Sequence, residues 1–337
     1  MATRKLCGRK VKHIKNETLF SEAAAEWLSA KSLSVKPSTC VRYKASLDSH
    51  ILPLLGNHAI EKLTTADIGA FAKEKLINGR LDKKGGLAPK TVIDMLCVIK
   101  SVLDFAFEAK IIRRPVSVQY PKYHSQPARV LNRKEQTLLE EELKKDTDIY
   151  KLGVLLCLYT GIRIGELCAL CWEDISIEHE MITVKGTLQR VKDLSGSGSK
   201  TRIEVGAPKS LSSARSIPIP KFLIGMIREH SKGKQGYFLG TGKKGYTEPR
   251  TMQNHFARIT KQLNIPNANF HALRHTFATR CVEAGVDIKS LSEMLGHSSV
   301  NITLNRYVHS SFEQKRAGIC KLELFCGVGA INKVAFC

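Results

Sequence analysis

Apolar residues recur every three or four positions along much of this chain, the spacing of one buried face of an α-helix. Before residue 112 this pattern predicts four helices, over residues 18–30, 38–52, 65–78 and 88–110. Thr64 and Asp67 have the spacing of a capping box, and Gly56 and Gly79 mark helix ends. The first part of the chain is therefore predicted to be helical throughout.

A different pattern, strict alternation, occurs in the middle of the chain. Alternation at Met181 and Thr183, and again at Ile203 and Val205, predicts strands, and the Ser-Gly repeat of residues 195–199 predicts a hairpin tip. Helical spacing returns over residues 270–283 and 288–295, and Gly296 supplies a left-handed stop. We therefore expect a mostly α protein with a small antiparallel β-sheet.

Length and proline placement predict two domains. A chain of 337 residues with 43% hydrophobic content is long enough for two cores. The segment 113–128 is polar and is interrupted by Pro115, Pro121 and Pro127, which favours an extended linker. The expected division is a basic tail (1–16), a helical domain (17–112), the linker (113–128), a second domain (129–316) and a C-terminal tail (317–337).

The charge balance favours a nucleic-acid partner. Lys and Arg number 53 against 31 Asp and Glu, which gives a net charge of +22. A basic protein of unrelated function remains the alternative on charge alone. Ten cysteines without paired spacing indicate a reducing compartment. We expect no secretory leader and no membrane span, and therefore a cytoplasmic protein that reaches the chromosome.

Four side chains that can handle a phosphate occur within residues 271–307. His271 and Arg274 are three residues apart, so one anion could meet both from one helix face. His297 follows the Gly296 stop, and Tyr307 follows ten residues later. Any one of these histidines alone is more commonly a satisfied structural residue, but the joint pattern favours a phosphate site.

The other half of such a site lies upstream. Arg163 stands at the predicted start of a helix, where backbone N–H groups also favour an anion, and Glu166 one turn later could hold its guanidinium. A surface ion pair is the plain alternative. Lys209 lies in a predicted turn, from which it could reach a leaving group, although most loop lysines are simply solvated.

A zinc site fits the sequence less well. His271 and His275 have the four-residue spacing of helical zinc ligands, but Ala272 stands where the general-base glutamate should be. Cys168 and Cys171 form a lone pair within an apolar run, and we interpret them as packed thiols. No metal or other cofactor is expected.

In this order, the six residues Arg163, Lys209, His271, Arg274, His297 and Tyr307 resemble the tyrosine recombinases, also called the phage integrase family. The family's boxes correspond to TGIRIGEL (160–167), HALRHTFAT (271–279) and LGH (295–297) through Tyr307. The resemblance covers about residues 17–316 and is greatest to integrases of bacterial conjugative transposons. One departure is Ala272, where the family often has Asp.

The resemblance implies a reaction for each residue. Tyr307 would attack the scissile phosphodiester and leave a 3′-phosphotyrosyl bond with a free 5′-hydroxyl, without metal or ATP. Arg163 and Arg274 would clamp the non-bridging oxygens, and His297 would hydrogen-bond one of them. Lys209 would act as general acid and His271 would accept the tyrosine proton, while His275 would serve the fold.

The resemblance also implies a helical, SAM-like core-binding domain over residues 17–112 and a mixed α+β catalytic domain over 129–316. Candidate DNA contacts on the second and fourth helices are Arg42, Tyr43, Lys90, Thr91 and Lys100, with ordinary solvated faces an equal alternative. Double-stranded core sites, a homotetramer on synapsed DNA, and an excisionase or DNA-bending accessory protein are the implied partners. The basic segment of residues 1–16 before the first helix is too short for a folded arm-binding domain.

Two other functions share these residues. A type IB topoisomerase would use a similar set as a monomer, and a catalytically silent DNA-binding relative would have lost one of the six. Segments after the nucleophile dock on a neighbouring subunit in the family. Docking of residues 317–337 within one chain is an equal alternative.

Overall fold

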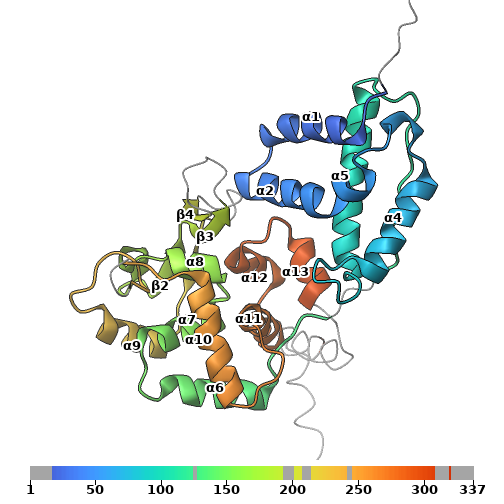
Figure 1. Cartoon of the computed structure of the whole chain (residues 1–337). Coiled ribbons are helices and arrows are strands. Elements are labelled where there is room, and N and C mark those ends of the chain that lie inside the picture. Colours follow the sequence, from blue (N-terminus) through green and yellow to red (C-terminus); the bar gives the residue numbers. More distant parts are fainter. Residues whose placement is uncertain are drawn as a thin grey trace, which may run out of the picture. The chain divides into compact units, whose positions relative to one another are not determined.

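A computed structural model of the chain describes residues 17–123, 127–192, 201–206, 214–240, 245–307 and 319 (Figure 1). The chain forms two compact units, one of residues 1–126 and 192–200 and the other of residues 127–191 and 201–337. The described part contains no helix long and apolar enough to cross a membrane.

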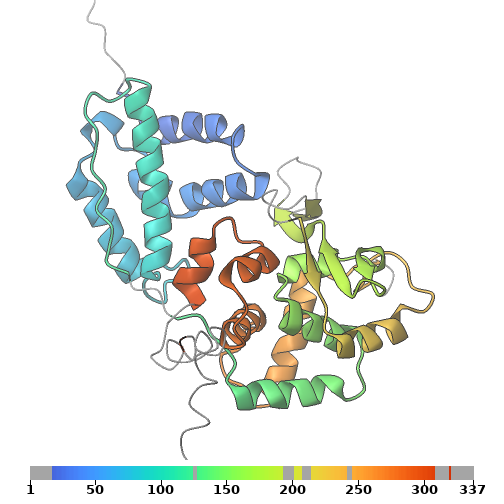
Figure 2. The same ribbon diagram turned by 180° about the vertical axis from the view of Figure 1, so that it is seen from behind.

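The first unit is a helical bundle, as the apolar spacing predicts. Its helices are α1 (Phe20–Ser32), α2 (Pro37–Ser46), α3 (Leu52–Leu55), α4 (Thr65–Asn78) and α5 (Pro89–Glu108), with the π-helical turn η1 (Leu47–Ile51) and the 3-10 turn η2 (Ile60–Lys62). The 20-residue α5 supplies one face of the core and packs against α1, α2 and α4 (Figure 2). Thr64 and Asp67 form the expected capping box before α4.

The predicted helix over residues 38–52 is present, but it is not an α-helix throughout. The chain is α-helical only to Ser46, passes through η1, and resumes as α3, whose first turn contains Pro53. Proline has no N–H and its ring displaces the preceding turn, so the Leu52 N–H bonds to the Leu47 carbonyl five residues back. This bend keeps Leu47, Ile51 and Leu55 in the core.

Smaller boundary errors have equally local causes. Thr18 and Leu19 are outside α1 because they pair with the start of η2: the Thr18 carbonyl accepts from the Ile60 N–H, and Leu19 forms a bridge with Ala59. Gly56 and Gly79 end their helices, but with right-handed backbone rather than a left-handed turn. Phe270 caps α11 instead of belonging to it.

The second unit is mostly helical with two small sheets. Its helices are α6 (Arg133–Lys144), α7 (Ile149–Thr160), α8 (Ile164–Ala169), α9 (Lys221–Ser231), α10 (Pro249–Gln262), α11 (His271–Glu283), α12 (Ile288–Leu295) and α13 (Val300–Tyr307), with the 3-10 turn η3 (Trp172–Asp174). Its strands are β1 (Ile175–Ser176), β2 (Met181–Val184), β3 (Thr187–Lys192), β4 (Thr201–Gly206) and β5 (Arg215–Pro218).

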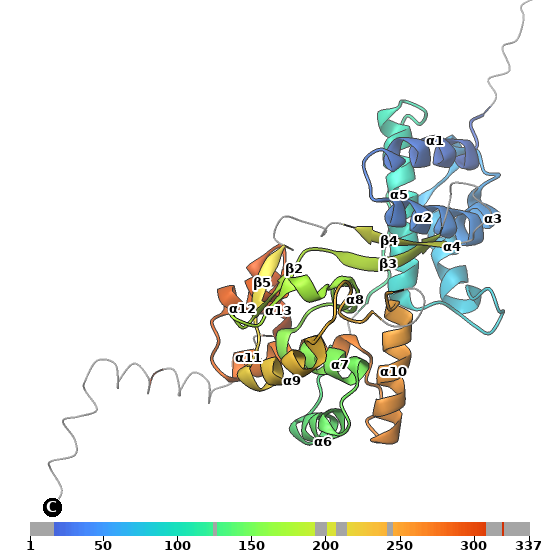
Figure 3. The ribbon, with the colours of Figure 1, turned by 90° about the vertical axis from the view of Figure 1, so that its left-hand side faces the viewer.

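The sheets follow the predicted alternation. Strand β2 pairs antiparallel with β1 and with β5, in a register that places Ile182 opposite Ile217, and both side chains are fully buried. Strands β3 and β4 form a separate two-stranded sheet (Figure 3). The predicted tip at residues 195–199 lies outside the described residues. The expected fold class, mostly α with small antiparallel sheets, is confirmed.

Helix α7 is the centre of the second unit. Every residue from Leu152 to Leu158 is buried, so the helix is apolar all round, as a helix surrounded by others must be. It packs against α6, α8, α9, α10 and α11. Helices α11 and α12 and the end of α13 form a second, smaller cluster around Phe277 and Leu295.

Two glycines in left-handed conformation end the helices that shape this region. Gly161 ends α7 with φ 66°, and Gly296 ends α12 with φ 63°. A Cβ at Gly161 would lie 2.4 Å from the Phe277 ring and 2.9 Å from Leu295. The position therefore requires glycine for its backbone and for its close packing.

We predict that Gly161→Ala destabilises the second unit by about 2 kcal/mol or more, because it combines left-handed strain with an overfilled core. Urea unfolding followed by circular dichroism measures this loss. The matched control is Gly225→Ala, in the middle of α9, where a Cβ meets nothing within 4 Å. That control should gain up to about 1 kcal/mol from helix propensity. Equal stability of the two variants would contradict the packing argument.

Candidate active site

Arg163 occupies the turn between α7 and α8. It is the N-cap of α8, and its backbone N–H donates to the Glu166 carboxylate at 2.8 Å. Its guanidinium donates from Nη1 to Glu166 Oε1 at 2.8 Å and from Nη2 to the Gly296 carbonyl at 3.1 Å. The predicted Arg163–Glu166 pair is present, and a bond to the end of α12 adds a long-range constraint.

Arg274 is held by the same two helix ends. Its side chain projects from α11, is 3% exposed, and donates to the Gly161 carbonyl at 2.8 Å and to the Leu295 carbonyl at 2.7 Å. Burial and the charge of Arg163 lower the pKa of Arg274 to about 9, so the guanidinium remains protonated at neutral pH. A buried, oriented guanidinium at this point can bind an anion with little rearrangement.

Glu166 joins a third arginine to the site. Arg215, at the start of β5, donates to the Glu166 carboxylate at 2.8 and 3.2 Å and to the Met294 carbonyl at 2.6 Å. Burial alone would raise the pKa of Glu166, but the hydrogen bonds and charges of Arg215 and Arg163 outweigh it and leave that pKa below the ordinary range. Sequence reasoning did not select Arg215, since only the fold brings β5 beside α8.

His271 lines a pocket together with Arg274. The pocket has a volume of about 470 Å³, and its wall also includes Asn269 and Gln253. The imidazole retains an exposed edge, yet desolvation and the charges of Arg274 and Arg306 lower the pKa of His271. At neutral pH the His271 imidazole is therefore uncharged and lies beside the fixed guanidinium of Arg274.

His297 follows the left-handed turn at Gly296, as expected. Its Nδ1 hydrogen-bonds Thr303 Oγ1 at 2.8 Å, and its ring lies parallel to that of Tyr307, with 6.5 Å between centroids. Burial and the charge of Arg274 lower the pKa of His297 to about 4. The hydrogen bond to a buried threonine fixes the ring orientation.

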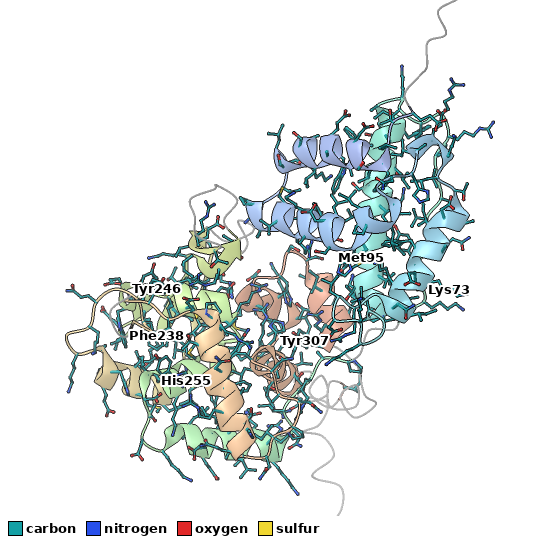
Figure 4. The ribbon with its side chains drawn as sticks, viewed as in Figure 1. Lys73, Met95, Phe238, Tyr246, His255 and Tyr307 are labelled. Carbon is teal, nitrogen blue, oxygen red and sulfur yellow. The ribbon has the colours of Figure 1, made fainter. Side chains whose placement is uncertain are left out.

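Tyr307 is the last residue of α13 and is 8% exposed. Figure 4 labels it beside α11 and α13. Its hydroxyl is 2.7 Å from Nδ1 of His275 on α11. Burial raises the pKa of Tyr307, although the charges of Arg274 and Arg306 oppose that effect.

His275 was expected to serve the fold, and its contact with Tyr307 was not foreseen. The residue is buried, as a structural histidine would be, but it also touches the side chain predicted to be the nucleophile. The spacing of residues 271–275 could have pointed to a contact with an anion or a metal. It contains no information about which of the following helices returns to it.

The structure thus gathers five of the six predicted residues in the second unit. Shared hydrogen bonds to the ends of α7 and α12 link Arg163 with Arg274, and ring contacts link His297 and His275 to Tyr307. Lys209 lies outside the described residues.

The cysteine interpretation needs one correction. Cys168 is buried in α8, but Cys171 lies beyond that helix, as the cap of η3, because α8 ends at Ala169. The two thiols therefore do not share a helix face. In the part of the chain that the structure describes, no group of three His, Cys, Asp or Glu side chains is arranged to hold a metal ion.

The candidate DNA contacts of the first unit fall into two groups. Arg42 and Tyr43 are on α2, with the Arg42 guanidinium 5.9 Å from the Tyr43 ring centre, and with Thr91 they line one cavity of about 430 Å³. Lys90 and Lys100 are on α5 and form ion pairs one turn along the helix, with Asp94 at 2.7 Å and Asp104 at 2.8 Å. The candidates are therefore of two kinds: residues that line a cavity around Tyr43, and exposed lysines that are already paired with carboxylates.

We predict that Glu166→Gln destabilises the second unit by about 3 kcal/mol at neutral pH, because it leaves two arginines with a weakened partner in a buried site. The native pKa of Glu166 lies below the unfolded value of about 4.3, so its contribution is complete above that value and is lost as pH falls through the native pKa. The difference between the two proteins should shrink below about pH 4.

Urea unfolding at several pH values measures this. The control is Glu229→Gln on the exposed side of α9, which removes the same charge without a buried partner. A Glu166→Gln difference that stays constant from neutral to acid pH would contradict the role of the carboxylate.

Comparison with known proteins identifies the family of this chain. The phage integrase family model matches residues 129–314, and the model for the phage integrase N-terminal SAM-like domain matches residues 19–76. A tyrosine recombinase XerC-like protein of Caldanaerobacter subterraneus is 29% identical, with 84% of this chain and 77% of that protein covered. The transposase of transposon Tn916 of Enterococcus faecalis is 26% identical over 67% of this chain and 56% of its own length.

Solved structures share the fold. The Tn1549 transposon integrase in complex with a circular intermediate DNA has a TM-score of 0.74 at 24% identity, with 90% of this chain and 99% of that chain covered. A λ integrase tetramer bound to a Holliday junction has a TM-score of 0.62 at 18% identity, covering 88% and 80%. The expected resemblance is confirmed. The chain therefore belongs to the phage integrase family, a family of tyrosine recombinases that carry out site-specific DNA recombination.

Proposed function

We propose that this protein integrates and excises a mobile element by cutting and rejoining DNA through a covalent bond to Tyr307. The observation that carries the proposal is the convergence of two arginines, two histidines and a buried tyrosine within one unit. Those groups suffice to bind a phosphodiester, to stabilise added charge, and to attack phosphorus.

Arg163 and Arg274 are the proposed phosphate clamp. A guanidinium has five N–H donors, and the hydrogen bonds to Glu166 and to the helix-end carbonyls use only some of them. The remaining donors can meet the non-bridging oxygens, where charge grows as the phosphorus becomes pentacoordinate. Because these bonds already orient both side chains, little reorganisation accompanies the reaction.

His271 and His297 complete the phosphate site in this proposal. His271 faces the pocket beside Arg274, where a neutral imidazole can donate to an oxygen of the bound phosphodiester. His297, oriented by Thr303, has its other ring nitrogen available for a second oxygen. Lys209 remains the proposed general acid for the departing 5′-oxygen, on the basis of its place in the family pattern.

The chemistry proposed needs no ATP. A phenol has a pKa near 10, far below that of an alcohol, so phenolate can leave when a 5′-hydroxyl attacks the phosphotyrosyl bond. The free energy of the original phosphodiester is kept in that bond. Joining to a new strand then uses the same groups in reverse, and the arginines supply the positive charge that a metal would otherwise bring.

Both units are proposed to bind double-stranded core sites. The positive charge of the whole chain, +22, supports contacts with phosphates. In the first unit, Arg42, Tyr43 and Thr91 form a mixed aromatic and polar group suited to a groove edge, whereas Lys90 and Lys100 would exchange their carboxylate partners for phosphates. The basic residues 1–16 are proposed to add contacts that do not depend on sequence.

The relatives support a proposed assembly and setting. The Tn916 and Tn1549 proteins belong to transposons, which supports a mobile element as the source of the DNA. The λ integrase forms a tetramer on a Holliday junction, which supports a homotetramer on synapsed DNA here. An excisionase or a DNA-bending protein is the proposed accessory partner, and the chromosome in the cytoplasm is the proposed place of action.

A type IB topoisomerase activity is the second candidate. An enzyme of that class could use the same two arginines, two histidines and tyrosine to cut one strand, let the DNA relax and rejoin it. The domain model at residues 19–76 and the transposon relatives favour recombination. Incubation with two recombination sites separates the two functions, because only a recombinase yields joint products. A silent DNA-binding protein would give neither products nor an adduct.

We predict that Tyr307→Phe keeps DNA binding but forms no covalent adduct with a suicide substrate, because it lacks the attacking oxygen. The adduct is measured as a slower band on a denaturing gel after incubation in EDTA, with a gel shift for binding. The control is Tyr246→Phe, labelled with Tyr307 in Figure 4, whose ring packs edge-on against Tyr237 away from the site. An adduct that persists in Tyr307→Phe would overturn the proposal.

A second prediction concerns the C-terminal tail, which, apart from residue 319, lies outside the described residues. If residues 318–337 dock on a neighbouring subunit, a chain that ends at residue 317 should bind one core site normally and assemble poorly on two. Native gels with one-site and two-site DNA measure the two steps. Unchanged synapsis would show that the tail acts within its own chain.

A further inference from the structure

The side chain in contact with the proposed nucleophile belongs to His275. Its Nδ1 lies 2.7 Å from the Tyr307 hydroxyl, a normal length for a strong hydrogen bond between buried groups. Both side chains are at most 8% exposed. Water therefore competes little for this hydroxyl, and the proton it carries has a defined neighbour.

The neighbouring His271 has different surroundings. The two rings are perpendicular, with centroids 4.6 Å apart, and His271 lines the pocket that Arg274 also lines. Helical geometry explains the division, because side chains four residues apart share a face but lie one turn apart along the axis. One ring therefore meets the pocket and the other meets the end of α13.

We propose that His275, rather than His271, accepts the Tyr307 proton when the tyrosine attacks DNA. This inference rests on the proposed function and assigns a further catalytic residue to that reaction. It requires the tautomer with hydrogen on Nε2, so that the Nδ1 lone pair accepts from the tyrosine O–H. His271 then serves the phosphate together with Arg274.

The step balances with these groups alone. The Tyr307 O–H bond breaks as its oxygen forms a bond to phosphorus, and the proton moves to His275 Nδ1. The bond from phosphorus to the 5′-oxygen breaks, and that oxygen takes a proton from the general acid. In the joining step the imidazolium returns its proton to the leaving phenolate.

The surroundings of His275 keep its imidazole unprotonated, as a general base must be before the reaction. His271 and Arg274 on α11 and Arg306 on α13 face it, and together with burial they lower the pKa of His275 to about 4. The free protein thus keeps the imidazole neutral and able to accept. A phosphodiester bound at Arg163 and Arg274 adds negative charge beside the same cations, which raises the affinity of His275 for a proton during attack.

His275→Asn and His275→Ala separate proton transfer from positioning. The Asn oxygen can occupy the place of Nδ1 and accept the hydrogen bond, but it cannot take the proton. We expect both variants to bind DNA and to form the Tyr307 adduct at least about 100-fold more slowly, the usual loss for a missing general base. The control is His179→Asn, an exposed imidazole in the turn before β2. Adduct formation by His275→Asn at the unmodified rate would overturn the inference.

A more acidic nucleophile gives a readout that a structural role would not move. Difluorotyrosine at position 307 loses its proton more readily, so it should speed cleavage more in His275→Asn than in the otherwise unmodified chain. An equal change in both backgrounds would count against proton transfer to His275. Thermal unfolding of each variant shows whether the second unit is folded.

The tautomer can be measured in the unmodified protein, which keeps the test independent of how well the variants fold. In nitrogen-15 spectra of labelled histidines, His275 is the imidazole whose signals shift in Tyr307→Phe through loss of the hydrogen bond. A protonated Nδ1 in the free protein would overturn the inference. Absence of any adduct from the unmodified chain would overturn the proposed function as well, whereas a fast adduct in His275→Asn overturns the inference alone.

Discussion

Carbonyl oxygens at the ends of two helices hold the arginines on which the rest of the site depends. Gly161 and Leu295 accept from Arg274, and Gly296 accepts from Arg163. Each bond joins the turn after α7 or the turn after α12 to a side chain from another element. Unsatisfied carbonyls at a helix end carry partial negative charge, so the guanidinium groups stabilise the ends that orient them.

This arrangement places several positive charges in a small, poorly hydrated volume. The carboxylate of Glu166 is hydrogen-bonded to both Arg163 and Arg215, and these bonds and charges keep its pKa low. Burial, together with the nearby arginine charges, lowers the pKa of His271 and of His297. Before DNA binds, the site is therefore a cation cluster with neutral imidazoles, which is the state that an incoming phosphodiester stabilises.

Local patterns in the sequence predicted many of the helices and strands that form the site. Helical spacing predicted α4, α5 and α12 closely, and the stop at Gly296 correctly placed His297 beyond a helix end. Alternation predicted β2 and β4. These features depend on neighbours within a few residues, which is the range that periodicity and capping describe.

The contacts that the sequence did not predict are between residues far apart along the chain. Arg215 joins the site because β5 packs near α8 and α12, and His275 meets Tyr307 because α13 returns to α11 across 32 residues. No local pattern encodes such pairings. The π-helical turn at residues 47–51 has a different cause, since Pro53 affects the turn that precedes it.

The fixed guanidinium of Arg274 has one more consequence. Its two carbonyl partners set both the position and the plane of the group, so its free N–H donors point in fixed directions. The two non-bridging oxygens of a DNA phosphodiester are diastereotopic, so a rigid set of donors can bind each of them differently. In the proposed reaction we therefore expect the site to distinguish the two oxygens, so that replacing one of them by sulfur would affect the rate more than replacing the other.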